Sequence, residues 1–559
     1  MSQPQPMSLS FSSLINDIEK GVIKIPQFQR DFVWNKARSA KLLDSIVKGY
    51  PIGTFILWKT DETLRVVRNI GGAKLPATPE GDWTQYVLDG QQRLTSLYAA
   101  VRGLKVERDG RIDDFAELCL DLNASEHEDI VLPHRDGQAD GSTISVVDLL
   151  NATLKTLSAF PDKFHEKLSY YKNRFESYAF SAVLLTGAEI DVATEIFTRI
   201  NVTGKALSVF EIMVAKTFDA KSDFDLAEKY DALQNRLRDV DYETIPEAVA
   251  MQTVAAIFAK DCTKKQILKI KKADFIECWP KAEEAIETTI DHFRTVYGIP
   301  VSRLLPYNAL VVPFAYFFHH KAKPTGDQAK FLQDFFWRAS LTGRYSVSLE
   351  SRLGQDLKYM DQIVKGRLPK YSADYSVDYS PQFIRDNGSF SVGRSYVKAI
   401  LCLLAFQEPK SFEDGHKVTI GNDWLRQANS RNYHHFFPRA YLRKKQWPES
   451  AINHVLNITI LDRRLNSDIS DKAPSIYMKK FVGKTPESTR NFARNMKSHL
   501  INNLDNFGIW QDDYEKFLKM RAKLISGELK KRIVPQQVDN SGQAVNTDDR
   551  DVELNDNDS

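Results

Sequence analysis

The chain of 559 residues is longer than one hydrophobic core usually organises, so we expect two to four domains. Its hydrophobic fraction of 42% and charged fraction of 27% are those of an ordinary soluble protein. It has no apolar run of about 18 residues, no signal-peptide pattern at its N-terminus, and four scattered cysteines without a Cys-x-x-Cys pair. These features exclude a membrane span, a disulfide framework and a zinc ribbon, and they predict a cytoplasmic protein.

The net charge of +3 conceals an uneven distribution along the chain. Residues 536–559 hold seven acids and one arginine, a charge of −6, so the rest of the chain carries +9. An excess of positive charge indicates a polyanion as partner. The tail is polar and almost free of large apolar residues, so we expect it to be disordered and to aid solubility. Competition of the tail with DNA for a basic groove is the alternative.

The first 60 residues are predicted to alternate between helical and extended segments. Residues 8–20 have the apolar spacing of a short amphipathic helix. Residues 23–34 are predicted to be extended, since Pro26 has no amide proton to donate and restricts the residue before it. Helical spacing returns over residues 35–49, and residues 54–58 are a candidate strand.

A predicted strand over residues 85–89 leads into Asp-Gly-Gln-Gln-Arg and then into a helix. Gly90 lets the backbone approach a ligand closely. The amides at the start of the helix favour an anion, and Arg93 can place two donors on a phosphate. The alternative is an ordinary turn followed by a helix cap.

Another polar loop follows a predicted strand at residues 180–185 and a predicted helix that ends at Asn201. Asn201, Thr203 and Lys205 present polar groups there, and Ser208 is placed to cap the next helix. A binding role and a plain helix–loop–helix connection are both compatible with this pattern.

Residues 216–390 are predicted to be mostly helical, with apolar residues at intervals of three and four in 245–260, 274–295, 308–320 and 327–340. A lysine cluster lies at positions 264, 265, 269, 271 and 272. It could contact a DNA backbone, although a solvated helix face is the simpler interpretation. The pair His319-His320 is not followed by a comparable motif of asparagines or carboxylates.

The most informative stretch is His434-His435-Phe436-Phe437-Pro438, followed by Asn457 and Asn466 on either side of a short apolar run. Hydrolysis of a phosphodiester needs a base that takes a proton from water and a metal that holds the phosphate. A histidine at the end of a strand, together with a distant asparagine, can supply both. Basic residues accompany the motif and are predicted to contact DNA phosphates: Arg439, Arg443, Lys444, Arg463 and Arg464.

This pattern resembles the His-x-x-Pro…Asn…Asn signature of HNH (His-Me finger) nucleases. The resemblance implies that His435 is the general base, that Asn457 orients its imidazole, and that Asn466 is a metal ligand. His434 occupies the position of the second metal ligand, which is more often an acid. Imidazole suits Mn²⁺, Ni²⁺ or Zn²⁺ better than Mg²⁺, so we expect Mn²⁺ or Ni²⁺ to support cleavage at least as well as Mg²⁺.

Three further segments carry a second resemblance, which covers roughly residues 8–215 and 395–500. They are Ile25-Pro26-Gln27-Phe28-Gln29-Arg30 with Trp34, Asp89-Gly90-Gln91-Gln92-Arg93, and Phe197-x-Arg199-Ile200-Asn201-x-x-Gly204. With the histidine motif downstream, the chain resembles the GmrSD-type family of type IV restriction endonucleases. The resemblance implies an α+β multidomain protein. We predict a ParB/sulfiredoxin-like domain at 1–220, a helical connection at 221–390, an HNH domain at 391–535 and a disordered tail at 536–559.

The same resemblance implies a nucleotide-regulated, metal-dependent endonuclease that acts on modified foreign DNA, often phage DNA. A nucleoside triphosphate would bind, and be hydrolysed, at a site that includes Asp89 and Arg93; its residues would be Gln29, Arg30, Asp89, Gly90, Gln91, Gln92, Arg93 and Asn201. A homodimer is an alternative to a monomer. Two other hypotheses are a nucleotide-switched DNA-binding protein without nuclease activity and a nuclease centred on the N-terminal half.

Overall fold

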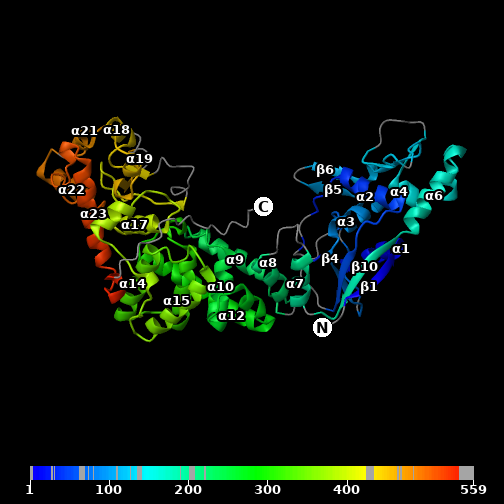
Figure 1. Ribbon diagram of the computed structural model, residues 1–559, viewed down its shortest axis with the longest axis horizontal. Helices are drawn as coiled ribbons and strands as arrows, with labels where there is room; N and C mark the ends of the chain where they lie inside the picture. The colour runs from blue at the N-terminus through cyan, green and yellow to red at the C-terminus, as the bar shows by residue number, and fades with distance from the viewer. Residues whose placement is uncertain are drawn as a thin grey trace. The chain divides into compact units, whose positions relative to one another are not determined.

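The computed structural model forms two compact units, residues 1–225 and 226–558 (Figure 1). It describes all residues except 1–3, 27–28, 30–31, 62–69, 74, 80, 109–110, 126, 135–140, 189, 201–207, 220–221, 423–432, 462–464, 466–468, 483 and 541–559. Within the described residues, no helix has both the length and the apolar character needed to cross a membrane.

The first unit is built on a mixed five-stranded sheet of order β1-β10-β3-β4-β2. Its strands are β1 (Gln5–Ser10), β2 (Ile23–Lys24), β3 (Phe55–Thr60), β4 (Thr84–Asp89) and β10 (Ala179–Thr186). The pairs β1–β10 and β3–β4 are antiparallel, whereas β10–β3 and β4–β2 are parallel. The predicted strands at 54–58, 85–89 and 180–185 are therefore confirmed.

The predicted helix at residues 8–20 is wrong at its start, because residues 8–10 belong to β1 and pair with Ala179–Ser181. The helix α1 (Phe11–Glu19) begins after Ser10, whose side chain accepts a hydrogen bond from the amide of Ser13. The predicted extended segment 23–34 contains the short strand β2. Helical spacing could not reveal β1, since its partner lies about 170 residues away along the chain.

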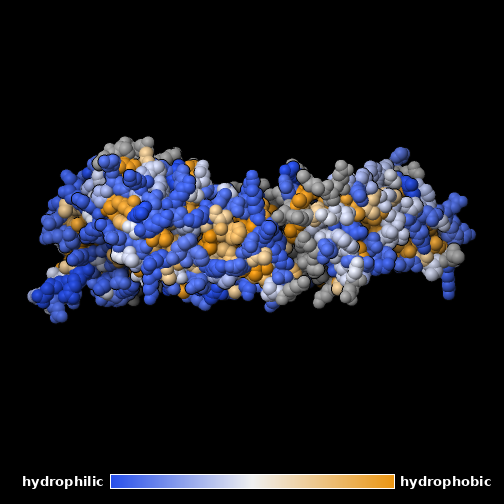
Figure 2. Space-filling model, turned by 90° about the horizontal axis from the view of Figure 1, so that it is seen from below, coloured by the Kyte–Doolittle hydropathy of each residue, from blue (hydrophilic) through white to orange (hydrophobic). Residues whose placement is uncertain are grey.

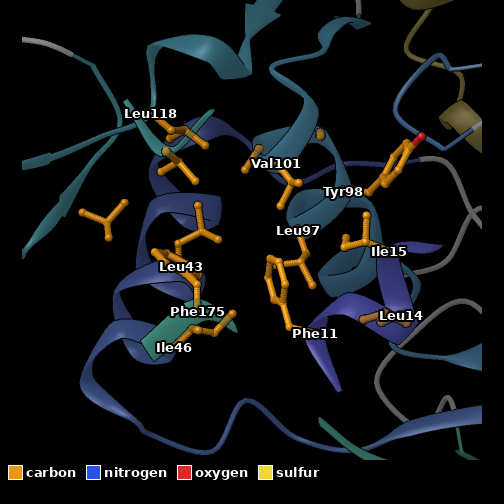
Figure 3. Packing of buried hydrophobic residues seen from close by; sticks show 14 of the residues in the cluster. Phe11, Leu14, Ile15, Leu43, Ile46, Leu97, Tyr98, Val101, Leu118 and Phe175 are labelled. Atoms are coloured by element: carbon orange, nitrogen blue, oxygen red, sulfur yellow. The ribbon is translucent and has the colours of Figure 1, made fainter. Parts of the chain in front are cut away.

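Helices pack their apolar faces together beside the sheet, as Figure 3 shows for Leu14, Leu43, Ile46, Leu97 and Phe175. These side chains come from α1, α2 (Lys36–Lys48), α3 (Gln91–Arg102) and α6 (His165–Glu176). The unit also contains short strands and helices: β5 (Lys105–Arg108), β6 (Arg111–Asp114), β7 (Cys119–Asp121), β8 (Val131–Leu132), β9 (Thr143–Ser145), α4 (Val146–Asn151), α5 (Leu154–Leu157), α7 (Ile190–Ile200) and α8 (Val209–Thr217).

The second unit is mainly helical. Its first helices confirm the predicted helical region: α9 (Leu226–Arg238), α10 (Glu247–Ala259), α11 (Lys264–Lys269), α12 (Lys272–Thr295), α13 (Val311–His320), α14 (Gly326–Leu341) and α15 (Leu349–Val364). The following helices are α16 (Pro381–Asn387), α17 (Ser395–Phe406), α18 (Arg439–Lys444), α19 (Glu449–Ile452), α21 (Pro474–Tyr477), α22 (Pro486–Lys497) and α23 (Tyr514–Lys530). Among its described residues they are interrupted by a small two-stranded antiparallel hairpin, β11 (Tyr433–His435) with β12 (Ile458–Ile460).

The helical region and the histidine motif share one compact unit, so the predicted boundary at residue 390 does not separate two units. Helix α17 is buried at ten of its twelve positions and contacts both α14 and α23. A helix that is apolar around its whole circumference must lie inside a core, and here it joins the two segments.

The predicted disordered tail begins too early. Residues 537–540 form a short 3-10 helix, and Asp539 accepts hydrogen bonds from Arg338 Nη1 at 2.5 Å and Nη2 at 2.8 Å. The side chain of Arg338 is fully buried and also pairs with Asp334. The rest of the tail, from residue 541, lies outside the described residues.

Candidate functional site

The two adjacent histidines of the motif lie on β11, where His434 pairs with Thr459 and His435 with Ile458. Neighbouring residues of a strand point to opposite faces, so the two imidazoles lie in different surroundings. The ring of His434 is 2% exposed and lies edge-on to Phe412 and Tyr477, with centroids 6.3 Å away in each case. The ring of His435 faces Asn453.

His435 is held by a hydrogen bond between its Nε2 and Asn453 Oδ1, at 3.0 Å. The Asn453 amide donates to the carbonyl of Phe390, which directs its oxygen toward the imidazole. Nε2 therefore carries the proton of the neutral ring. Burial lowers the pKa of His435 to about 4, although hydrogen bonds with Asn453 and with the backbone of Tyr433 oppose this shift. The ring is therefore neutral at pH 7 and able to accept a proton.

Asn457 does not contact the imidazole of His435, so its predicted role as the direct orienting group is wrong. Its fully buried carboxamide accepts from the amide of Phe437 at 2.8 Å and donates to the carbonyls of Phe437 and Ile452. Its backbone carbonyl accepts from the amide of Phe436. Asn457 thus holds the loop after β11, whose backbone groups have left the hairpin ladder and need other partners.

Two further residues that the sequence motif did not reveal support this loop and the turn that leads into Asn457. Tyr477, fully enclosed in the core, donates its hydroxyl proton to the carbonyl of Phe436 at 2.6 Å. His454 accepts from the amide of Leu456 through Nδ1 and donates to the carbonyl of Arg385 through Nε2. Both nitrogens of His454 are used inside the fold, and burial lowers its pKa to about 4. His454 is therefore a structural residue that fixes the turn leading into Asn457.

Arg521 of α23 is a cation buried next to the turn that leads into Asn457. It is fully buried and donates from Nη1 to the carbonyl of Leu456 at 2.7 Å. Its Nε and Nη2 have no hydrogen-bond partner in the described part of the chain. Burial lowers the pKa of Arg521 to about 9, so it stays charged at pH 7. No local pattern identifies this residue, because it reaches the motif through a backbone carbonyl 65 residues earlier.

Only one of the two predicted metal ligands lies among the described residues. His434 is described, whereas Asn466 lies outside the described residues. Within those residues, no group of three or more His, Cys, Asp or Glu side chains could hold a metal ion. The ring of His499 lies 4.9 Å from that of Phe412, and its Nε2 bonds the carbonyl of Lys410. An imidazole and a carboxamide oxygen are nevertheless a donor set that suits Mn²⁺ or Ni²⁺.

The predicted DNA-contacting residues Arg439, Arg443 and Lys444 all lie exposed on α18. Arg443 pairs with Glu449, and Lys444 pairs with Asp471 at 2.8 Å. Exposed pairs contribute only about 0–1 kcal/mol, so a phosphate can replace either carboxylate. Arg463 and Arg464 lie outside the described residues.

In the first unit, Gly90 has φ +95° and lies directly before α3. A Cβ at this position would lie 2.5 Å from Phe55 Cδ1, so the turn requires glycine. Arg93 donates to the carbonyls of Ile52 and Thr54 and pairs with Asp89 at 2.9 Å. Its guanidinium therefore ties α3 to the start of β3 instead of projecting into solvent.

The glutamines of this motif also make internal contacts. Gln29 donates to the carbonyls of Val87 and Leu88, and Gln92 accepts from the amides of Val33 and Trp34. Gln91 accepts from Gln92. Gln29 is thereby fastened to the end of β4, and residues 33–34 are fastened to the start of α3, although no side-chain hydrogen bond caps this helix. Arg30 and Asn201, the other predicted nucleotide contacts, lie outside the described residues.

Comparison with known proteins matches both units to one family. Residues 11–218 match the model of the GmrSD restriction endonuclease N-terminal domain. Residues 378–526 match the model of the GmrSD restriction endonuclease C-terminal domain. The chain is also 24% identical over 583 aligned positions to an uncharacterized protein of Methanocaldococcus jannaschii, covering 92% of this chain and 96% of that protein.

Proposed function

Since the chain belongs to the GmrSD family of restriction endonucleases, we propose that it is a metal-dependent DNA endonuclease with His435 as general base. The observation that carries this proposal is the arrangement of β11, in which a neutral imidazole is held by Asn453 and its loop by Asn457. We infer that the hairpin is part of an HNH finger and that the sheet of the first unit is ParB/sulfiredoxin-like.

In this proposal, His435 Nδ1 accepts a proton from the attacking water, while the bond from Nε2 to Asn453 keeps the ring fixed. The positive charge that develops on the imidazole is favoured once an anionic phosphate replaces water beside it. Arg439 and its neighbours on α18 would contact phosphates of the same strand. A divalent ion held by His434 and Asn466 would supply Lewis-acid stabilisation of the phosphate. This role would require the ring of His434 to leave its buried position beside Phe412 and Tyr477.

We further propose that a nucleoside triphosphate binds the first unit at the start of α3 and regulates cleavage, and that the DNA is modified, as phage DNA often is. Family membership and the glycine-requiring turn at Gly90 support this part. Because Asp89 and Arg93 already pair, a phosphate at this site would have to compete with the Asp89 carboxylate for the guanidinium.

A plasmid-nicking assay tests the proposed function. The full chain is incubated with Mn²⁺, Ni²⁺ or Mg²⁺, with and without nucleoside triphosphates, on plain, glucosylated-hydroxymethylated and phosphorothioated DNA. We expect nicked or linear product with Mn²⁺ or Ni²⁺ at least as quickly as with Mg²⁺. DNA binding without any product under all these conditions would contradict the proposal and favour a nucleotide-switched DNA-binding protein.

A further inference from the structure

Helix α22 (Pro486–Lys497) carries three exposed cations in one line: Arg490, Arg494 and Lys497, called here the α22 stripe. At about 100° per residue, positions 490, 494 and 497 fall within a sector of about 60°. The buried residues Phe492, Asn495 and Met496 are centred on the opposite side of the helix. The stripe therefore points straight away from the core.

One acid of the same helix, the exposed Glu487, lies three residues before Arg490, but no ion pair joins it to the α22 stripe among the described residues. None of its three side chains forms an ion pair among the described residues, whereas Arg443 and Lys444 on α18 both do. Lys479, Lys480 and Lys484, which precede the helix, are also exposed. The end of the second unit that Figure 1 labels α22 is accordingly covered largely by hydrophilic residues in Figure 2. Like charges placed one turn apart repel each other, so this surface lowers its energy when it meets a polyanion.

The residues directly after α22 are joined by hydrogen bonds and ring contacts to residues that pack against the histidine motif. Ser498, directly after α22, accepts a hydrogen bond from the amide of Lys410, and His499 binds the Lys410 carbonyl. Phe412 lies between the rings of His499 and His434, with centroid distances of 4.9 and 6.3 Å. Two ring contacts thus connect the end of α22 with β11.

We propose that the α22 stripe binds the phosphate backbone of duplex DNA and holds the duplex on the unit that contains His435. The inference rests on the proposed endonuclease function and adds a DNA-binding surface to it. The three cations are spaced about 6 Å and 4.5 Å along the helix axis, and their long side chains can reach consecutive phosphates. Contacts of this kind position a duplex without reading its sequence.

Binding of a 30-base-pair duplex to the full chain, measured without divalent metal from 50 to 200 mM salt, tests the inference. In the variant R490Q/R494Q/K497Q, the slope of log K against log salt should become shallower by about 2 to 3 units, since each lost phosphate contact removes about 0.9. The variant R490K/R494K keeps the charge and should retain most of the slope. All changed side chains are exposed, and an unchanged unfolding midpoint confirms that each variant folds.

The matched control is K264Q/K265Q/K269Q, which removes three exposed lysines from α11 in the same unit. We expect this control to keep the wild-type slope. A wild-type slope in the α22 variant, or an equal loss of slope in the control, would overturn the inference while leaving nicking by the wild type intact. Failure of the wild-type chain to bind DNA would instead overturn the proposed function together with the inference.

Discussion

At the scale of single residues, two asparagines near His435 have different roles. Substitution of one should lower activity, and substitution of the other should lower stability. The side chain of Asn453 hydrogen-bonds the imidazole and the Phe390 carbonyl, whereas the fully buried Asn457 makes three side-chain hydrogen bonds with the backbone. We expect Asn457→Ala to destabilise the fold by about 2–4 kcal/mol, because it leaves buried backbone groups unpaired. Asn453→Ala should slow nicking while changing the free energy of unfolding by about 1 kcal/mol or less. Equal effects of both variants on stability, measured by urea unfolding, would contradict this division.

His454 makes stability depend on pH. Its pKa is lowered by burial to about 4 from 6.5, so the unfolded chain binds a proton at higher pH than the folded chain. The contribution of the neutral ring is complete above pH 6.5 and is lost as the pH falls toward 4. Between pH 7.5 and 5.5, His454 should therefore account for a loss of about 1 kcal/mol.

The check is the urea unfolding free energy of the wild type and His454→Gln at both pH values. Glutamine does not titrate in this range, so the variant should be less stable at pH 7.5 but should lose less on acidification. The same decrease in both proteins would show that His454 is not responsible.

At the scale of elements, the short 3-10 helix at residues 537–540 closes a buried ion-pair cluster on α14. Arg338 is fully buried between Asp334 and Asp539. Breaking a buried pair leaves an uncompensated charge and costs about 3–5 kcal/mol. We expect Asp539→Ala, or a chain ending at residue 535, to lose stability on this scale. Truncation after Asn540 removes only residues outside the described part and should leave the unfolding midpoint unchanged, whereas an equal loss in both truncations would contradict the role of Asp539.

The elements also show how far local sequence patterns reach. Helices with apolar periodicity, such as α12 and α14, and the strand–turn–helix at Gly90 were predictable because their signals lie within a few residues. Strand β1 and the ordered start of the tail were not, since the partner of β1 is β10 and that of Asp539 is Arg338, 201 residues earlier. The acidic composition of the tail predicted that it lies in solvent, but the ion pair of Asp539 with the buried Arg338 holds the start of the tail against the fold.

The same distinction applies to the candidate site. The histidine motif drew attention to His435 and Asn457, whose residue types and spacing are local. Asn453 and Arg521 act through contacts that only the folded chain creates, one with a ring 18 residues away and one with a carbonyl 65 residues away. The sequence also suggested a phosphate-binding role for Arg93, whereas the structure shows that its donors bind Ile52, Thr54 and Asp89.

At the scale of the whole molecule, family membership covers both compact units, so a regulatory and a cleaving part are proposed within one chain. The α22 stripe and α18 would give the second unit two basic surfaces beside one hairpin. DNA affinity and DNA cleavage should therefore be separable by mutation, with the stripe affecting the first and His435 the second.

The most direct measurement is the single-turnover nicking rate of His435→Ala on a plasmid, compared with His319→Ala from the second histidine pair. His319 is exposed at the end of α13, so its substitution should leave the rate unchanged. Loss of a positioned base should slow His435→Ala by about 10²–10⁴-fold, with DNA affinity retained. A wild-type rate for His435→Ala would contradict the account.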